Sequence, residues 1–288
     1  MTALVVLTQA AEGSDSLAGQ LSAAGFQVER WPLVRLIPAA TQTIRPVLER
    51  LGDFDWVLIL SPSAVRLVAR RMKELDIAWP ANLRAGLVGP ASVEAFRDCF
   101  GDAPMVETPL EPPHDARHLV ELIVANQDFR QRDAAGAAVR VLVLNRPDGR
   151  TQWMEALRQN VQSVEVVAAY TAEPMIDGPS ADLMRRLQQA RRSGGPVHWV
   201  IGAGSHVDLL LQALPAGWAE WAKRQPVLVP HAAVLAHARA AGFEDACVYD
   251  DRPDLVERLQ YLGTRHGPAP ADPADSNADN EELSVLTL

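Results

Sequence analysis

The chain has 288 residues, 48% of them hydrophobic and 22% charged, and a formal net charge of −9 at pH 7. This length is typical of two globular domains, each long enough to bury its own core. The negative charge argues against nucleic acid or an acidic membrane surface as a partner, because proteins that bind them carry a basic excess. The sequence has no positively charged start and no apolar run of about 18 residues, so we expect no signal peptide, no membrane span and a cytoplasmic location.

The first half of the chain alternates apolar strands with amphipathic helices. The hydrophobic pattern predicts strands at 4–7, 26–31, 56–60 and 83–88 and helices at 14–24, 91–100 and 116–125. Ser63 is expected to cap the helix after the strand at 56–60, because a serine hydroxyl can accept a hydrogen bond from a first-turn amide. A proline-rich loop at 108–114 precedes the helix at 116–125.

The second half continues the same alternation. Strands are expected at 139–144, 164–170 and 246–249, a connector at 171–179 and a last helix at 253–262. Repeated strand-then-helix order implies parallel sheets with right-handed crossovers. Residues 264–288 are acidic and lack any hydrophobic period, so a disordered tail is expected there.

One strand–turn–helix pattern occurs twice in the sequence. Residues 57–69 align without gaps on 199–211, which lie 142 positions later, and residues 86–101 align on 227–242, 141 positions later. Two segments that keep nearly one offset predict two similar α/β domains. A cleft between twin domains would be a natural site for a small ligand.

Motifs for metal and nucleotide chemistry are weak. The seven histidines form no HExxH motif and no Cys/His cluster, so no metal site is predicted. Gly202-Ala203-Gly204 follows a strand as in a dinucleotide-binding fingerprint, but Val207 occupies the position of the third glycine. This fingerprint is therefore incomplete.

The stronger pattern is a set of small or polar turns between strands and helices. These turns are 61–63, 89–92, 146–150, 202–205 and 230–232. In an open parallel sheet such turns lie at the carboxyl ends of the strands, where ligands bind, and the free amides of helix N-termini favour anions. A capping role accounts for any single turn, but all of them facing one cleft would predict a polyanionic small molecule as ligand.

An ordered series of segments carries a resemblance to a known family. The segments are VVLTQ with LAGQLSAAGF, WPLVRLIP at 31–38, SPSAV at 61–65, LVGPAS at 87–92, VLVLNRPDGR at 141–150, VVAAYTAEP at 166–174 and VPHAAVLAHARAAGF at 229–243. In this order and at these spacings they resemble the uroporphyrinogen-III synthase family over residues 3–262. No single string is specific, and the resemblance rests on the whole series.

The resemblance implies an architecture that the repeat alone does not give. Two parallel-sheet α/β domains would be interleaved in sequence, joined by two extended linkers near 33–38 and 171–174, with a cleft between them. One domain would combine residues 1–35 with 173–262, and the other would be residues 38–170. Residues 264–288 would remain a disordered acidic tail.

The resemblance also implies a reaction. The family closes hydroxymethylbilane, a polyanionic linear tetrapyrrole, to uroporphyrinogen III in haem biosynthesis, with loss of water and inversion of ring D. It uses no metal and no cofactor. A monomer is expected, with possible hand-over of the substrate from the deaminase that forms the bilane.

Site residues follow from the same resemblance. Tyr170 matches the family's tyrosine just before the second linker, which implies that its phenol assists loss of the hydroxyl group as an acid. The carboxylates of the substrate would be met by turn amides, hydroxyls and guanidinium groups. The residues implied are Ser61, Ser63, Gly89, Ser92, Arg146, Gly149, Arg150, Gly204, Ser205, His231 and Ala232.

Several positions depart from the family pattern. Gln9 and Ala233 stand where arginine is common, Ala116 stands where serine is frequent, and 202–205 read GAGS in place of a hydroxyl-rich turn. The two missing cations leave a second interpretation open, a catalytically silent protein that binds a tetrapyrrole or scaffolds other enzymes of the pathway. A nucleotide-dependent enzyme that uses the turn at 202–204 is a third.

Overall fold

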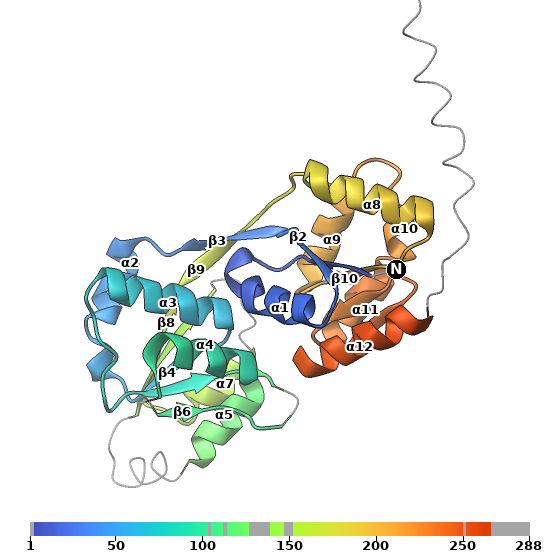
Figure 1. Ribbon diagram of the computed structural model, residues 1–288. Coiled ribbons are helices and arrows are strands. Elements are labelled where there is room, and N and C mark those ends of the chain that lie inside the picture. Colours follow the sequence, from blue (N-terminus) through green and yellow to red (C-terminus); the bar gives the residue numbers. More distant parts are fainter. Residues whose placement is uncertain are drawn as a thin grey trace, which may run out of the picture. The chain divides into compact units, whose positions relative to one another are not determined.

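The chain folds into two compact units. The computed structural model describes residues 3–102, 105–111, 114–126, 139–146, 152–249 and 252–265. Unit 1 comprises residues 1–35 and 174–288, and unit 2 comprises residues 36–173. Unit 1 is therefore built from both ends of the chain, shown as the blue and the orange to red segments of Figure 1.

Unit 1 contains a five-stranded parallel sheet in the order β12-β11-β10-β1-β2. Its strands are β1 (Leu4–Leu7), β2 (Gln27–Arg30), β10 (Val197–Val200), β11 (Val227–Val229) and β12 (Ala246–Val248). The three central strands are buried along their whole length. They are apolar runs because helices cover both faces of a parallel sheet.

The two faces of this sheet bury alternate residues of the same strands. Val6 and Trp199 pack with α8 to α11, whereas Leu7 and Val200 pack with α1 and α12. This alternation follows from the two-residue period of a strand. The helices are α1 (Ala11–Ala23), α8 (Ala181–Ser193), α9 (Gly204–Ala213), α10 (Ala219–Lys223), α11 (Ala232–Ala240) and α12 (Arg252–Arg265).

Unit 2 contains a second five-stranded parallel sheet in the order β6-β5-β4-β7-β8. Its strands are β4 (Trp56–Ile59), β5 (Arg84–Leu87), β6 (Val106–Glu107), β7 (Arg140–Asn145) and β8 (Ser163–Ala168). Ile59 and Leu144 pack with α2, α3 and α4 on one face, and Leu58 and Val143 pack with α5 and α7 on the other. The helices are α2 (Thr41–Leu48), the short 3-10 helix η1 (Leu51–Asp53), α3 (Pro62–Glu74), α4 (Pro90–Phe100), α5 (Ala116–Ala125) and α7 (Gln152–Arg158).

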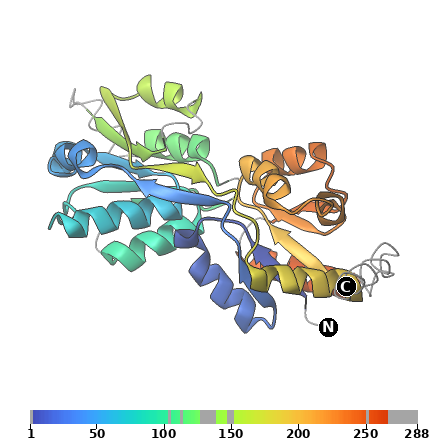
Figure 2. The same ribbon diagram turned by 90° about the horizontal axis from the view of Figure 1, so that it is seen from above.

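The two segments that connect the units pair with each other. β3 (Val34–Pro38) and β9 (Tyr170–Pro174) form a two-stranded sheet and run side by side in both views (Figure 1, Figure 2). Just outside this sheet, the amide of Ala39 donates to the carbonyl of Ala169 over 2.9 Å. The linkers expected from the sequence are therefore extended, and they are also hydrogen-bonded as strands.

The two five-stranded sheets have the same strand order and the same register. Strands β6, β5, β4, β7 and β8 take the places of β12, β11, β10, β1 and β2. Val57 pairs with Ala85, and the residues 142 positions later, Trp199 and Val227, pair in the same way. The prediction of two similar parallel-sheet α/β domains interleaved in sequence is confirmed.

The second repeat was misaligned by one residue at its strand. The sequence pattern paired Gly86 with Val227, whereas the ladder makes Ala85 the counterpart of Val227. The offset of 142 falls to 141 only at Gly101 and Gly242, which both have positive φ near the ends of the helices. The change is absorbed within the helical segments, because α4 has 11 residues and α11 has nine.

Two local predictions in unit 2 were wrong. Ser61, and not Ser63, caps α3, because Pro62 occupies the first helical position and the helix begins earlier than expected. The strand expected at 164–170 ends at Ala168, and Tyr170 already belongs to β9. Ala169 lies between them, buried, with its amide bonded to the carbonyl of Asn145 at 2.9 Å.

The last helix is longer than expected. α12 continues to Arg265, so residues 264 and 265 are helical and not part of the expected tail. Residues 266–288 lie outside the described residues.

Candidate functional site

The carboxyl edge of the unit 2 sheet gathers several of the predicted site residues. Ser61 follows β4, Gly89 follows β5, Arg146 follows β7 and Tyr170 follows β8. These four strands are neighbours in a parallel sheet, so the residues that follow them lie along one edge. Helices α3 and α4 also begin at this edge, with first-turn amides that favour anions.

Tyr170 and Ser61 are in direct contact at this edge. The phenol oxygen Oη of Tyr170 lies 3.4 Å from Oγ of Ser61, and the same Oγ accepts a hydrogen bond of 3.2 Å from the amide of Ala64. The Tyr170 ring is partly buried against the hydrophobic cluster below α3 and α4. Its hydroxyl therefore lies close to the first turn of α3, at the positive end of that helix dipole.

The start of α4 combines a strained glycine with the buried hydroxyl of Ser92. Gly89 has φ 75° and ψ 163°, a conformation adopted almost only by glycine, and a Cβ there would lie 3.3 Å from Cβ of His114. Ser92 is fully buried, and its Oγ has no hydrogen-bond partner among the described residues. Oγ1 of Thr108, just after β6, is also buried and has no hydrogen-bond partner among the described residues. Such groups are costly, and a polar ligand could satisfy them only after neighbouring atoms move.

The remaining predicted site residues of unit 2 are partly exposed or lie outside the described residues. Ser63 is the second residue of α3 and is partly exposed, as is Arg146 directly after β7. Gly149 and Arg150 lie outside the described residues.

The carboxyl edge of the unit 1 sheet carries the remaining predicted residues. Gly204 is the first residue of α9, and Ser205 after it is exposed. His231 occupies the position before α11, and Ala232 begins that helix. Both residues are exposed. The amides at these two helix starts are of the kind that binds anions.

The departures from the expected family pattern in unit 1 lie at this edge. A Cβ on Gly202 would lie 2.8 Å from Cγ of Gln9, so glycine at 202 is explained by the packing of Gln9. Oε1 of Gln9 is buried and has no hydrogen-bond partner in the described part of the chain. Ala233 is exposed and presents only a methyl group. The turn at 202–204 thus has a packing role that needs no nucleotide.

Sequence reasoning missed two pairs of side chains in contact, one beside the start of α9 and one at the start of α5. In unit 1, Nε2 of His237 on α11 lies 2.9 Å from a carboxylate oxygen of Asp208 on α9, and the His237 ring packs beside Gly204. In unit 2, Asp115 caps α5 by accepting from the backbone amide of His118 at 2.9 Å and from its ring at 2.8 Å. An aspartate directly before an apolar-periodic helix was the signal that could have revealed the second pair.

Comparison with known families decides the classification of the chain. A family model described as uroporphyrinogen-III synthase HemD matches residues 15–255. The chain belongs to the uroporphyrinogen-III synthase family. It is thus assigned to a family of enzymes of tetrapyrrole biosynthesis. No curated protein matches the sequence significantly.

Solved structures of uroporphyrinogen-III synthases have the same fold. A mutant of the enzyme from the extremely thermophilic bacterium Thermus thermophilus matches 92% of this chain and 100% of its own, with 13% identity and a TM-score of 0.51. The enzyme from Helicobacter pylori matches 91% of this chain and 100% of its own, with 10% identity and a TM-score of 0.52. At these identities the likeness concerns the fold.

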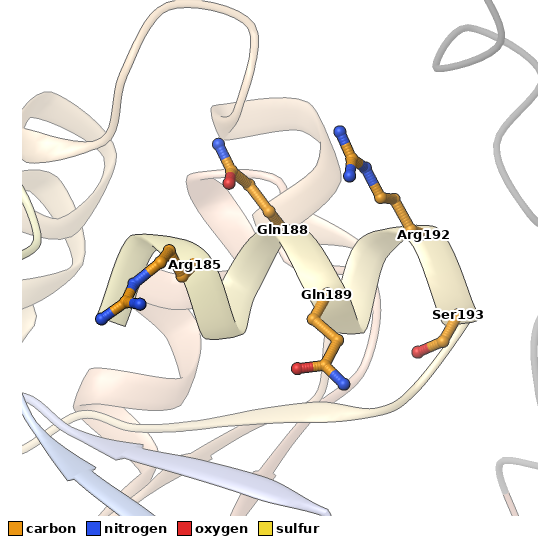
Figure 3. A pocket seen from close by; sticks show the side chains of 5 residues that line it. All are labelled: Arg185, Gln188, Gln189, Arg192 and Ser193. Atoms are coloured by element: carbon orange, nitrogen blue, oxygen red, sulfur yellow. The ribbon is translucent and has the colours of Figure 1, made fainter. Parts of the chain in front are cut away.

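Two surface hollows lie apart from the residues that the synthase resemblance implies. One runs along a single helix, α8, and is lined by Arg185, Gln188, Gln189, Arg192 and Ser193 (Figure 3). A second, on unit 2, is lined mostly by apolar side chains that include Trp79 and Phe100. Neither contains a predicted site residue, so the carboxyl edge of each sheet remains a candidate site by itself.

Two further features of this synthase-family chain concern metals and membranes. Within the described ranges, no group of three or more His, Cys, Asp and Glu side chains is arranged to hold a metal ion. No helix in that part of the chain is both long and apolar enough to span a membrane.

Proposed function

We propose that this chain converts hydroxymethylbilane into uroporphyrinogen III, with loss of water and inversion of ring D. Membership of the synthase family supports this activity in tetrapyrrole biosynthesis. The observation that carries the proposal is the Tyr170 phenol at the carboxyl edge of the unit 2 sheet, in contact with the first turn of α3. A phenol at a ligand-binding edge is a suitable hydrogen-bond donor to a leaving hydroxyl group.

The proposed chemistry needs one acid and a pyrrole ring. The bond between the terminal methylene carbon and its hydroxyl oxygen breaks, and the electron pair leaves with the oxygen. Tyr170 gives its proton to that oxygen, so that water departs, while the pyrrole nitrogen supplies electrons to the carbon. The terminal methylene carbon first bonds to the ring D carbon that already carries the bridge to ring C, and that older bridge bond then breaks, which turns ring D round. The released bridge carbon, now cationic, bonds to the unsubstituted α carbon of ring D, and the proton lost from that carbon returns to the phenolate. The net result is loss of one water.

The candidate site also suits a substrate with many carboxylates. Helix starts at α3, α4, α9 and α11 supply amide donors, and Arg146 and Ser63 are partly exposed at one of the edges. The net charge of −9 gives no long-range attraction for a polyanion, so these local donors must bind it. Such binding would hold the cationic intermediate in the folded shape that favours inversion.

An isomer-resolved assay tests the proposal. Freshly generated hydroxymethylbilane is added to the protein, and the product isomers are separated. We expect isomer III in excess, whereas isomer I alone, which forms spontaneously, would overturn the proposal. Tyr170→Phe should lower the rate about 100-fold, at the lower end of the range for proton-transfer catalysis, because the pyrrole already promotes departure of the hydroxyl. Tyr261→Phe, on α12, is the matched control and should leave the rate unchanged.

One observation favours an alternative, a catalytically silent protein that binds a tetrapyrrole on the same fold. Gln9 turns its side chain onto Gly202, and Ala233 is a small exposed residue, so neither adds a cation to the unit 1 edge. Saturable binding of hydroxymethylbilane without enhanced formation of isomer III would support this alternative. Turnover at an enzymatic rate would exclude it.

A further inference from the structure

The Ser61 hydroxyl lies between a helix amide and the Tyr170 phenol. Its Oγ accepts from the amide of Ala64 at 3.2 Å and lies 3.4 Å from Oη of Tyr170. The position of Ser61 is fixed on both sides, because it lies two residues after β4 and its carbonyl accepts from the amide of Val65 at 3.1 Å. Pro62 further restricts the first turn of α3.

The backbone beside Tyr170 is fixed by hydrogen bonds of the preceding residue. The amide of the preceding residue, Ala169, donates to the carbonyl of Asn145, and its carbonyl accepts from Ala39, each at 2.9 Å. The Tyr170 ring packs against the core cluster of unit 2. The ring position is therefore set by packing, and the contact with Ser61 is left to set the direction of the phenol hydrogen.

The donors and acceptors available to Ser61 limit the direction of its hydrogen bond with Tyr170. A serine hydroxyl has one hydrogen and two acceptor sites, and a backbone amide can only donate, so one acceptor site of Ser61 is taken by Ala64. The Ser61 hydrogen remains available for Oη of Tyr170. If the phenol hydrogen went to Ser61 instead, Tyr170 could not give it to a leaving group. A working acid at Tyr170 thus requires Ser61 to be the donor.

We propose that Ser61 is a positioning residue that donates its hydrogen to Tyr170 and directs the phenol hydrogen toward the substrate. The hydrogen bonds then run in one direction, from the Ala64 amide through Ser61 to Tyr170 and on to the leaving oxygen. Each donor in such a chain polarises the next, and the positive end of α3 adds to the effect. This inference rests on the proposed function of Tyr170, and it replaces direct substrate binding as the role of the Ser61 hydroxyl.

Substitution by glycine separates this role from helix capping. Glycine is tolerated at an N-cap almost as well as serine, so Ser61→Gly removes the hydroxyl while α3 persists. Ser61→Thr keeps a hydroxyl and should restore activity. Ser180→Gly is the matched control, because Ser180 caps α8 through the amide of Leu183 at the same 3.2 Å and is not part of the candidate site.

Kinetics of these variants give the first readout. We expect Ser61→Gly to lower kcat about tenfold, the size of one ordinary hydrogen bond, with KM nearly unchanged. In a Tyr170→Phe background the same substitution should have no further effect, because the group it acts through is gone. A raised KM with unchanged kcat would assign Ser61 to substrate binding and overturn the proposal. An equal loss of kcat in both backgrounds would overturn it too.

A spectroscopic readout does not depend on turnover. The Raman ring doublet of tyrosine distinguishes a phenol that accepts a hydrogen bond from one that only donates. The chain has three tyrosines, so the Tyr170 signal is isolated by subtracting the spectrum of Tyr170→Phe. The proposal is supported if the Tyr170 phenol accepts a hydrogen bond in the wild type and in Ser61→Thr but not in Ser61→Gly. A Tyr170 phenol that only donates in the wild type overturns it. Absence of isomer III in the assay would overturn the proposed function but not the hydrogen bond from Ser61 to Tyr170, because the Raman doublet reports that bond directly.

Discussion

At the scale of single residues, Gly89 is where backbone conformation and side-chain packing limit substitution together. Its φ of 75° and ψ of 163° strain any residue with a Cβ, and that Cβ would press on His114 at 3.3 Å. We expect Gly89→Ala to lower the free energy of unfolding by about 1–3 kcal/mol, measured by urea unfolding. The helix start that carries Ser92 would be displaced with it.

Gly101 provides the matched control for this substitution. It has φ 75° and ψ −166° at the other end of the same helix, with no atom of the described chain within 4 Å of its added Cβ. Gly101→Ala should therefore show the backbone strain alone, and the difference between the two variants should report the contact with His114. Equal losses would mean that His114 moves aside without cost.

At the scale of elements, Asp115 at the N-cap of α5 should make the free energy of unfolding depend on pH. Partial burial by itself would raise the pKa of Asp115, but the hydrogen bonds from His118 and the nearby charge outweigh it and hold the pKa below its ordinary value. A depressed folded-state pKa stabilises the fold above the unfolded value of about 4, and the contribution is lost as pH falls through the folded value. Asp115→Asn keeps a capping oxygen and removes the charge.

We expect this asparagine variant to be slightly less stable than the wild type at pH 7 and equal to it once the pH is well below the folded pKa of Asp115. The effect is small because the side chain is half exposed, and salt should reduce it further. Asp115→Ala, which also loses the cap, should cost about 1 kcal/mol at pH 7. Urea unfolding of the three proteins across pH gives the comparison, and a gap between wild type and Asp115→Asn that widens in acid would contradict it.

Elements were predictable where the apolar pattern was dense. The buried strands β1, β4, β5 and β7 and the helices that follow β4 and β5 were found at nearly their observed positions. Helix α2 was missed because Pro46 lies inside it, and the burial of Ile44, Val47 and Leu48 outweighs that residue's cost. Helix α8 was missed because only Leu183 and Leu187 form its buried stripe, although Ser180 and Gly194 mark its two ends.

The sheet edge that carries the predicted site residues could be inferred from the sequence, whereas the contacts made at that edge could not. Strand ends and small turns predicted the edge at which Ser61 and Gly89 lie, and the family resemblance added Tyr170. The cap was assigned to Ser63 because both serines precede an apolar period, and only the position of Pro62 distinguishes them. The break at Ala169, which brings Tyr170 to Ser61, involves no glycine or proline, so the sequence pattern carried no signal for it.

At the scale of the whole molecule, the repeat and the fold carry different information. A repeat identifies β4 with β10 and β5 with β11, but not which strand lies beside them. In unit 1, β10 pairs with β1, from the opposite end of the chain. This long-range pairing depends on complementary buried faces that no local pattern encodes, and the family resemblance implied only that residues 1–35 belong with 173–262.

Separate cores should make the two units unfold separately. Each of the four hydrophobic clusters found in the described residues draws its members from one unit. Leu58 in β4 and Leu210 in α9 are both fully buried, and each belongs to a cluster of a different unit. Replacing either by alanine should destabilise its own unit by about 2–5 kcal/mol, because a buried cavity remains.

Hydrogen exchange followed by mass spectrometry distinguishes the two outcomes for this pair of variants. We expect Leu58→Ala to accelerate exchange in β4, β5 and β7 while β1, β10 and β11 keep their wild-type rates, and Leu210→Ala to give the reverse. Each variant is thus the control for the other. The chain passes twice between the units, so a single cooperative unfolding reaction is the competing possibility, and it would accelerate exchange in both sheets equally. Two separable sheets would mean that a substitution at the carboxyl edge of one sheet leaves the helix starts of the other unit intact.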